Sequence, residues 1–198
     1  MIKFIRPSLV ILTFYTIILG CVYPLSVTAI AQLFFSRHAN GSVIKLDDSN
    51  VGSYLIGQSF ISDLYFHGRP SATSMPDPND STKTIDAPYN ATNSSGSNLG
   101  PTSKVLIDRI NVLIKGRQSE DKISSDEVTT SASGLDPDIS PNYALSQVKR
   151  VSIARNIAED KLQKLVEDHI EGRILGVIGE PHINVLTLNI ELDHISHK

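Results

Sequence analysis

The stretch 129–141 reads TTSASGLDPDISP, and it combines several local signals that determine where the main chain turns and where a helix begins. Gly134 can adopt a positive φ angle, which favours a tight turn. A proline at position 137 restricts the preceding Asp136 to extended geometry. Ser140 followed by a proline is typical of a helix N-cap and the first helical residue. The sequence therefore predicts a rigid corner at 129–141, directly followed by a helix.

Apolar residues recur at helical spacing on both sides of this corner. After it, a helix is predicted from apolar residues at every third or fourth position, namely Leu145, Val148, Val151 and Ala154. A second helix follows through residues 162–166 and ends near His169. Before the corner, residues 105–114 predict a further helix.

The period of residues 183–193 is ambiguous. Four apolar residues alternate with other residues as in a half-exposed strand: Leu186, Leu188, Ile190 and Leu192. A subset with Val185 also fits one face of a helix, but the strict alternation favours a strand. Short apolar runs at 41–44 and 51–57, bounded by turn-forming residues, predict strands or tight turns of the core. Together with the helices, these patterns predict an α+β domain.

The first 36 residues differ in composition from the rest of the chain. No charged side chain occurs from residue 7 to residue 36, and a membrane span needs about 20 apolar residues. Lys3 and Arg6 precede the segment, so the positive-inside rule places the short N-terminal end in the cytoplasm. We therefore predict an N-terminal transmembrane segment at 1–36 and an extracytoplasmic α+β domain at 37–198.

The alternative to a membrane span is cleavage within this segment. Residues 18–21, ILGC, are similar to a bacterial lipoprotein cleavage box, in which Cys21 would become the lipidated N-terminus. The residues after Cys21 stay apolar through Phe35, whereas the tether that follows a lipid anchor would be polar. Length and composition favour the uncleaved span.

The overall composition excludes several classes of protein. The chain has 198 residues, 20% of them charged, and a formal net charge of −3, so it lacks the basic field that nucleic-acid binding requires. With Cys21 as its only cysteine, one chain can form neither an internal disulfide nor a cysteine-based zinc site. Between residues 71 and 101 the composition shifts to Ser, Thr, Asn, Asp, Pro and Gly, which predicts one long polar loop.

Two motifs that could bind ions fail on spacing. Asp136, Asp138 and Ser140 are spaced like the start of a calcium loop, but a proline occupies the position that needs glycine, and a glutamine the one that needs glutamate. Residues 96–104, GSNLGPTSK, are similar to a phosphate cradle, but Pro101 interrupts the Gly-Lys-Ser/Thr succession of a P-loop. A structured turn followed by a helix cap is the simpler interpretation of residues 96–104.

Catalytic motifs are also missing from the sequence. Ser131 and Ser133 lie outside any Gly-x-Ser-x-Gly elbow, and spacing identifies no base for them, so a membrane-anchored hydrolase is an alternative without support. The Asp-Lys-Thr-Gly phosphorylation motif of P-type pumps does not occur either. We expect neither a catalytic centre nor a metal site in this chain.

Several longer strings occur along nearly the whole chain. They are YPL at 23–25, ANGS at 39–42, GSYLIGQ at 52–58, YFHGRPSA at 65–72, SGSNLGP at 95–101, the corner at 129–141, QVKRV at 147–151 and NVL at 184–186. Together they resemble the C subunit of the Kdp-type potassium-transporting ATPase. One departure is visible, because the family usually has Ser-Gly-Gly-Ser-Asn where this chain has a serine at position 95. If that glycine needs a positive φ, Ser95 would strain the loop.

The resemblance implies a single-pass accessory subunit of the plasma membrane, with no catalytic centre and no cofactor of its own. Its implied partners are a potassium-channel-like subunit, a P-type ATPase catalytic subunit and membrane lipid, in a complex for ATP-driven potassium uptake. The family is also described as a chaperone for ATP binding by the pump subunit. A direct contact with ATP would conflict with an extracytoplasmic domain, because ATP is inside the cell.

Two sets of candidate site residues follow from the resemblance. Nucleotide or partner contacts, with ATP reached through the complex, would involve Gly96, Ser97, Asn98 and Gln147. Partner contacts for assembly would involve Arg69, Pro70, Gly134, Asp136, Pro137, Asp138, Ser140 and Pro141.

Overall fold

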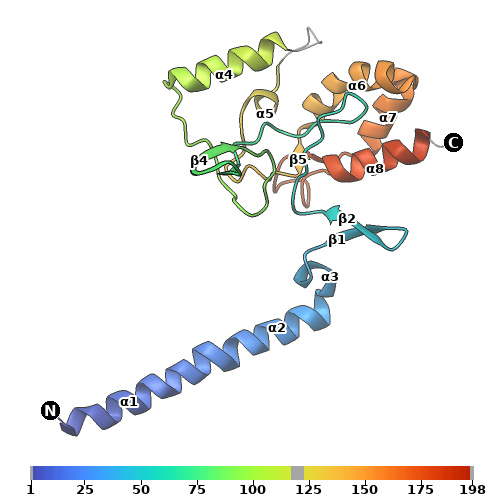
Figure 1. The fold of residues 1–198 in the computed structure, drawn as a ribbon. Helices are drawn as coiled ribbons and strands as arrows, with labels where there is room; N and C mark the ends of the chain where they lie inside the picture. The colour runs from blue at the N-terminus through green and yellow to red at the C-terminus, as the bar shows by residue number, and fades with distance from the viewer. Residues whose placement is uncertain (1, 117–122, 197–198) are drawn as a thin grey trace. The chain divides into compact units, whose positions relative to one another are not determined.

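The computed structural model describes residues 2–116 and 123–196. The chain divides into two compact units, Met1–Val51 and Gly52–Lys198. The first unit holds a long apolar helix and a short sheet, and the second holds an α+β domain (Figure 1). The predicted α+β class with an N-terminal apolar helix is confirmed.

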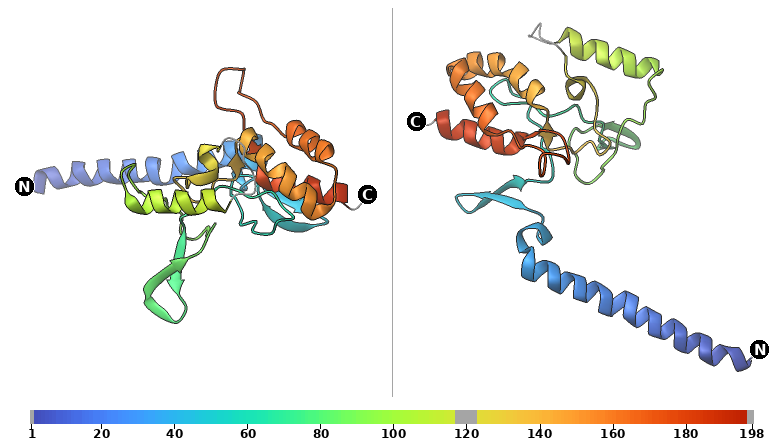
Figure 2. Two further views of the ribbon diagram at one scale, coloured as in Figure 1. Left: turned by 90° about the horizontal axis from the view of Figure 1, so that it is seen from above. Right: turned by 180° about the vertical axis from the view of Figure 1, so that it is seen from behind.

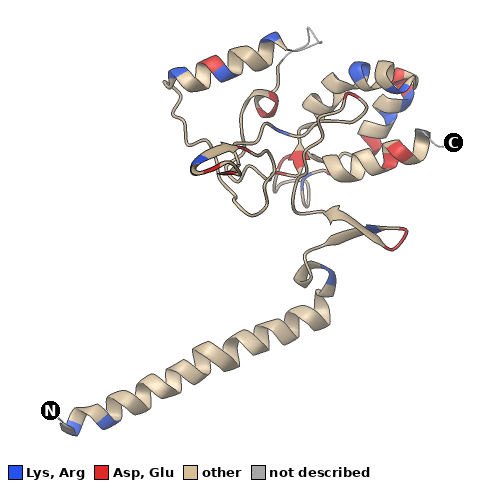
Figure 3. Ribbon diagram, in the orientation of Figure 1, with Lys and Arg blue, Asp and Glu red and all other residues tan. Residues whose placement is uncertain are grey.

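The first unit begins with one long helix, formed by α1 (Ile2–Ile17), a π-helical turn η1 (Ile18–Val22) and α2 (Tyr23–Phe34). Its stretch Lys3–Phe34 is 32 residues long, and an 18-residue window within it has a mean hydropathy of 2.0, so it is the one helix among the described residues that is long and apolar enough to cross a membrane. At 1.5 Å per residue it spans about 48 Å, more than the hydrocarbon core of roughly 30 Å. Figure 3 shows Lys and Arg only near its N-terminal end.

The π-turn η1 lies directly before Pro24 in α2. In a regular α-helix the proline lacks the N–H for an intrahelical bond, and its ring would collide with the carbonyl of Gly20. A π-turn is one of the few local changes that accommodate such a misfit. The effect of Pro24 is therefore a local change of helix type, and the helix continues through Cys21 to Phe34.

After the long helix come a short helix, α3 (Ser36–Ala39), and the paired strands β1 (Val43–Leu46) and β2 (Ser49–Ser53). Asp47 and Asp48 join the strands with φ angles of 46° and 64°, and positive φ at both central residues defines a type I′ turn. The strands are confirmed, but their side chains are exposed or only half-buried. Their predicted place in the core is therefore wrong, because no residue of either strand is fully buried and the two strands pair only with each other among the described strands.

The core of the second unit lies between three helices and a short sheet. Helices α6 (Pro141–Arg155), α7 (Glu159–Asp168) and α8 (Val185–Ser196) pack in sequence, and β5 (Asp138–Ile139) pairs antiparallel with β6 (Ile183–Asn184). The α6 and α7 predictions are confirmed. The side chains with no exposed surface are Phe66, Ala144, Val151, Leu162, Val166, Ile183, Leu188 and Leu192.

The strand predicted for residues 183–193 is wrong beyond its first two residues. Only Ile183–Asn184 is a strand, and α8 begins at Val185. Asn184 favours this switch, because its Oδ1 accepts the main-chain N–H of Thr187 at 3.2 Å in the manner of a helix N-cap. The apolar residues that lie at helical spacing are the ones buried in the core, where α8 packs against α7. This packing is a tertiary effect, and the spacing of apolar residues in the sequence does not reveal it.

The segment predicted as one polar loop at 71–101 contains a β-hairpin, which corrects that prediction. β3 (Ser74–Asp77) pairs antiparallel with β4 (Asp80–Asp86). The turn is stabilised by the N–H of Asn79, which donates to the Asp77 carboxylate at 2.8 Å. Apart from the cross-strand pair Met75 and Ile85 the hairpin is mostly polar, so hydrophobic alternation did not mark it. The helix predicted at 105–114 is confirmed as α4 (Lys104–Lys115), and a short helix α5 (Ser125–Val128) precedes the corner.

Candidate functional site

The corner at 129–141 is a turn held by hydrogen bonds to its own hydroxyls. Gly134 has a φ of 67°, as the sequence predicted, and its N–H donates to Ser131 Oγ at 2.9 Å. Ser71 Oγ donates to the Gly134 carbonyl at 2.7 Å. A Cβ atom at position 134 would lie 2.7 Å from the Ser95 carbonyl oxygen, so only glycine fits this approach.

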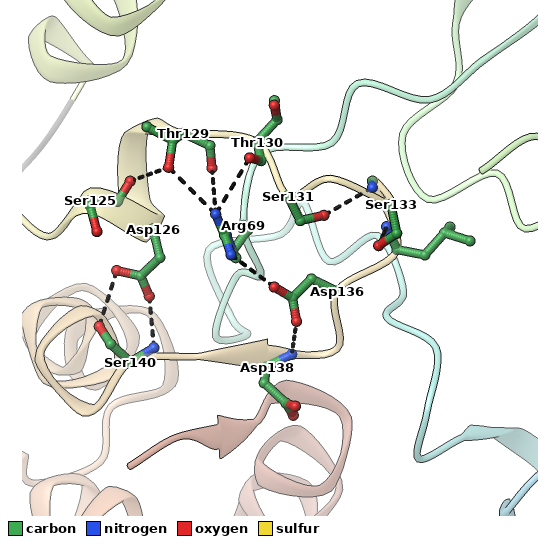
Figure 4. Close-up of polar contacts among 12 residues, drawn as sticks. Arg69, Ser125, Asp126, Thr129, Thr130, Ser131, Ser133, Asp136, Asp138 and Ser140 are labelled. Atoms are coloured by element: carbon green, nitrogen blue, oxygen red, sulfur yellow. Dashed lines mark hydrogen bonds and ion pairs between the residues drawn. The ribbon is translucent and has the colours of Figure 1, made fainter. Parts of the chain in front are cut away.

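Arg69 joins the two arms of the corner (Figure 4). Its Nη1 donates to Asp136 Oδ2 at 2.9 Å, and its Nη2 lies 3.4 Å from both the Thr129 hydroxyl and the Thr130 carbonyl. Asp136 uses its other oxygen to accept the N–H of Asp138 at 3.2 Å. The side chains of Arg69 and Asp136 are 23% and 28% exposed, so the ion pair is largely shielded from water. The predicted site residues 69, 134, 136 and 138 therefore form one connected structure.

Ser140 caps helix α6 with help from α5. Its Oγ accepts the N–H of Tyr143 at 3.2 Å, which confirms the predicted N-cap, and Pro141 is the first residue of the helix. Asp126 in α5 accepts the Ser140 N–H at 2.7 Å and its hydroxyl at 3.1 Å. Sequence reasoning missed Asp126, because nothing in the spacing connects a carboxylate fourteen residues upstream with this cap.

Asp138 links the corner to the C-terminal strand. It pairs with Asn184 in the β5–β6 register, and Asn184 Nδ2 donates to Asp138 Oδ1 at 3.1 Å. The neighbouring Pro137 carbonyl accepts the N–H of Val185 at 3.0 Å, where α8 begins. Burial raises the pKa of the Asp138 carboxyl, and the hydrogen bond from Asn184 partly opposes this shift. The Asp138 carboxylate is therefore less stable in the folded protein than in water.

The loop at 94–98 packs against the outer side of the corner. Gly96 approaches the main chain of Ala132 so closely that a Cβ atom would lie 2.8 Å from the Ala132 oxygen. Thr130 Oγ1 donates to Ser97 Oγ at 3.2 Å, so Ser97 is connected to Arg69 through one residue. Asn98 has a positive φ of 50°, whereas Ser95 does not adopt a positive φ. The serine that replaces the family's glycine therefore causes no backbone strain.

Gln147 contacts a different segment, the strap at 61–69. Its Oε1 accepts the His67 N–H at 2.8 Å, and its Nε2 donates to the His67 carbonyl at 3.0 Å. Asn189 of α8 makes the same pair of bonds to Phe66, both at 2.9 Å. This double amide clamp, Gln147 and Asn189, satisfies two successive residues of an extended strap that has no neighbouring strand. Sequence reasoning missed Asn189, although a polar residue on the apolar face of a helix was the available signal.

Two arginines of α6 fasten the first half of the strap. Arg150 donates to the carbonyls of Asp63 at 2.8 Å and Tyr65 at 2.9 Å. Arg155 donates through Nε to the Leu64 carbonyl at 2.6 Å, and its guanidinium lies 4.5 Å from the centre of the Tyr65 ring. The strap thus reaches Arg69 in a defined position.

A cavity of about 370 Å³ lies beside the strap, lined by residues from α4, α5 and α6. Its walls carry both signs of charge, from Asp63, Glu127, Lys149 and Arg150. Burial lowers the pKa of the His67 imidazole on the same wall, which keeps that group neutral near pH 7. Such a mixed lining does not provide the concentrated positive potential that a phosphate group needs.

The two candidate nucleophiles act as turn formers. Ser131 Oγ accepts the Gly134 N–H, and Ser133 Oγ accepts the Leu135 N–H at 3.1 Å. No histidine occurs among their hydrogen-bond partners in the described part of the chain. Within residues 2–116 and 123–196, no group of three or more His, Cys, Asp or Glu side chains could hold a metal ion. The geometry serves to order the main chain.

Comparison with known proteins gives a match along almost the whole chain. The family model for KdpC, described as the K+-transporting ATPase c chain, matches residues 5–194. The chain belongs to the KdpC family. It is 54% identical to the potassium-transporting ATPase KdpC subunit of Bradyrhizobium diazoefficiens, with 100% of both chains covered. It is also 54% identical to the KdpC subunit of Rhodopseudomonas palustris (strain BisB18), over 98% of each chain, and 50% identical to that of Methylobacterium nodulans.

Membership of the KdpC family confirms the resemblance inferred from the sequence strings. The residues predicted for assembly lie in the corner itself and at the adjoining end of the strap, where Arg69 pairs with Asp136. It does not unite the four residues predicted for nucleotide or partner contact. Ser97 is bonded to the corner, whereas the described bonds of Gln147 join it to His67 and Arg150.

Proposed function

We propose that this KdpC-family chain is a non-catalytic, single-pass accessory subunit that supports assembly of a potassium-transporting ATPase. Its partners would be a potassium-channel-like subunit, a P-type ATPase catalytic subunit and the surrounding lipid, as the family resemblance implies. The observation that carries the proposal is the helix Lys3–Phe34, whose apolar surface is not buried by any other part of the described chain. Such a surface needs lipid or partner helices around it.

We propose that the helix lies in the plasma membrane with residues 1–36 forming the membrane segment. Lys3 and Arg6 at its start support a cytoplasmic N-terminus, and residues 37–198 would then form an extracytoplasmic domain.

The polar groups of the corner support a scaffold role more than a chemical one. Arg69, Asp136, Asp138 and Ser140 each form hydrogen bonds with main-chain or side-chain partners within the unit, and Nε of Arg69 is the one buried side-chain atom of this set without a partner among the described residues. We propose that the corner holds a surface, including Pro70 and Pro141, in the shape that a partner subunit recognises. A preorganised surface binds with a smaller entropic cost than one that must order on contact.

For Gly96, Ser97, Asn98 and Gln147 we favour partner contact or structural support over nucleotide contact. The Gln147 amide oxygen already accepts two hydrogen bonds, from His67 and Arg150, and two lone pairs are all that it has. Support of ATP binding by the pump subunit would then be transmitted through the complex. Amide-exchange protection of residues 96–98 by ATP in the complex would contradict this assignment.

The experiment that tests the proposal combines assembly and topology. We expect the full-length chain to co-purify with the other subunits, and a chain lacking residues 1–36 to lose most of this association. For topology, an exposed residue of the β3–β4 hairpin is changed by Ser81→Cys in a Cys21→Ser background. A membrane-impermeant maleimide should label it in intact cells, and the Cys21→Ser parent provides the control. Labelling only after cell lysis would reverse the proposed orientation.

A further inference from the structure

The segment between α7 and β6 forms a second protruding feature, which we name the 171–182 hairpin. Its base is closed by two main-chain hydrogen bonds between Glu171 and His182, at 2.8 and 3.1 Å. Nearer the tip, the Ile174 N–H donates to the Ile178 carbonyl at 2.9 Å. Figure 2 (left) shows the hairpin extending away from α6, α7 and α8.

The tip of this hairpin is apolar and exposed. Leu175 and Gly176 form the reversal with φ angles of 53° and 74°. The exposed fractions of the four large side chains are 69% for Ile174, 90% for Leu175, 79% for Val177 and 63% for Ile178. Single exposed apolar residues are ordinary on a protein surface, but a contiguous group at the end of a projection marks a contact site.

Four of the five main-chain N–H groups of the tip, residues 174–178, are already satisfied within the hairpin. The N–H groups of Ile174, Gly176, Val177 and Ile178 all donate to carbonyls within the hairpin, at 2.9 to 3.2 Å. Burial of a main-chain N–H that lacks a partner would cost free energy comparable with a lost hydrogen bond. The tip therefore has the properties of a preformed apolar plug.

The base of the hairpin is held in place by charged and polar side chains. Arg173 and Glu180 form an ion pair at 2.8 Å across the two arms. The Tyr54 hydroxyl donates to the Glu171 carboxylate, which joins the base to the start of the second unit. The chain then passes directly into β6, which pairs with β5 of the corner. The hairpin is thus connected to the corner through β6.

We propose that the tip, residues 174–178, inserts into an apolar pocket on another subunit of the potassium-transporting ATPase. This inference rests on the proposed role in assembly and adds the element that makes the contact. Family membership supplies the partner, because the relatives are named as subunits of this ATPase. The absence of charge within the tip fits the core of a stable interface, where charged residues are depleted.

A lipid surface fits the same hairpin less well. Segments that bind the membrane interface carry Lys and Arg for the anionic headgroups and aromatic side chains for the boundary. Between residues 171 and 182 there are two glutamates, one arginine and no aromatic residue. The single arginine, Arg173, is already paired with Glu180. Electrostatics therefore favour a protein partner.

The first test measures whether the tip becomes covered. The full chain carrying Leu175→Cys in a Cys21→Ser background is reacted with a maleimide, once alone in nanodiscs of phosphatidylcholine and phosphatidylglycerol and once in the purified complex. We expect labelling in the complex to be at least about tenfold slower than in the chain alone. Ile61→Cys is the matched control, because Ile61 is an apolar side chain outside the hairpin that is 86% exposed, and its labelling rate should not change.

Each other outcome overturns the inference in a recognisable way. Slow labelling in nanodiscs without partner subunits would mean that lipid covers the tip. Fast labelling in the complex would mean that the tip stays free. If the unmodified chain does not assemble with the other subunits at all, the proposed function fails, and not only the role of the hairpin.

The second test measures the contribution of the tip to affinity. Anchors of this kind typically dominate an interface, so the double variant L175D/V177D should weaken co-purification with the other subunits on the order of 10- to 100-fold. I61D should have no effect. Both positions of the tip are exposed, so thermal unfolding of the isolated chain should be unchanged by either variant. Normal assembly of the double variant would refute the inference.

Discussion

The double amide clamp gives the sharpest prediction about stability. Asn189→Ala removes the side chain that accepts the Phe66 N–H and donates to the Phe66 carbonyl, both at 2.9 Å. Phe66 has no exposed surface, and Asn189 is 2% exposed, so water cannot replace either bond without opening the core. The substitution should therefore destabilise the second unit well beyond the loss of an ordinary surface contact.

The magnitude follows from the two main-chain groups left without a partner. Each buried group without a hydrogen bond costs about 1–3 kcal/mol, so Asn189→Ala should lower the free energy of unfolding by about 2–6 kcal/mol. Since m is about 1–3 kcal/mol per molar of urea, the midpoint of unfolding should fall by roughly 1–3 M. That is a large share of the 5–15 kcal/mol typical of a whole domain.

Urea unfolding of the full chain in detergent, followed by near-ultraviolet circular dichroism of its tyrosines, measures this change. Gln163→Ala is the matched control, because it also replaces a helical amide side chain with alanine. Gln163 donates to Glu167 on the exposed face of α7, and its loss should change stability by less than about 0.5 kcal/mol. Equal effects of the two substitutions would refute the clamp.

Two further predictions concern the corner. Burial raises the native pKa of Asp138, so this carboxyl favours the folded state at low pH and loses that contribution as the pH rises through the native pKa. Asp138→Asn, which keeps an acceptor for Asn184, should therefore be more stable than the parent at pH 7, with the difference vanishing below the ordinary aspartate pKa of about 3.9. Gly134→Ala should cost about 2–4 kcal/mol, from the positive φ and the close Ser95 oxygen, whereas Gly100→Ala, with open space around it, should cost little. Thermal unfolding across pH measures both.

Two results would contradict these predictions. If Asp138→Asn is less stable than the parent at pH 7, and this deficit disappears as the pH falls, then the carboxylate, rather than its protonated form, is favoured in the fold. Equal destabilisation by alanine at positions 134 and 100 would mean that the corner adapts to a side chain.

Sequence patterns predicted the structural elements whose conformation is set by residues adjacent in the chain. The start of α6 followed from Ser140 and its proline, and the turn at Gly134 followed from the freedom of glycine. The polar β3–β4 hairpin escaped prediction, because no hydrophobic alternation marks a strand that is not packed on a core. The 171–182 hairpin escaped it too, since its apolar residues are exposed and resemble a core segment in the sequence.

Most residues of the candidate site were predicted from the sequence, but the ion pair and hydrogen bonds that join them were not. The family strings pointed to Arg69 and Asp136, yet only the fold shows that they form an ion pair across 67 residues of chain. Gln147 was assigned to the same group as the loop at 96–98, whereas the structure places its amide on the strap. Asp126 and Asn189 were absent from the prediction, because their roles depend on partners far away in the sequence.

The sequence by itself determined the long apolar helix, the corner and the family of this protein. Each of these depends on the identity of consecutive residues, which local sterics and hydrophobicity convert directly into structure. Only the tertiary structure decided that residues 185–196 form a helix and that two amide side chains satisfy the strap. The reason is physical: both outcomes depend on burial, and a residue's burial is set by segments that approach it only when the chain has folded.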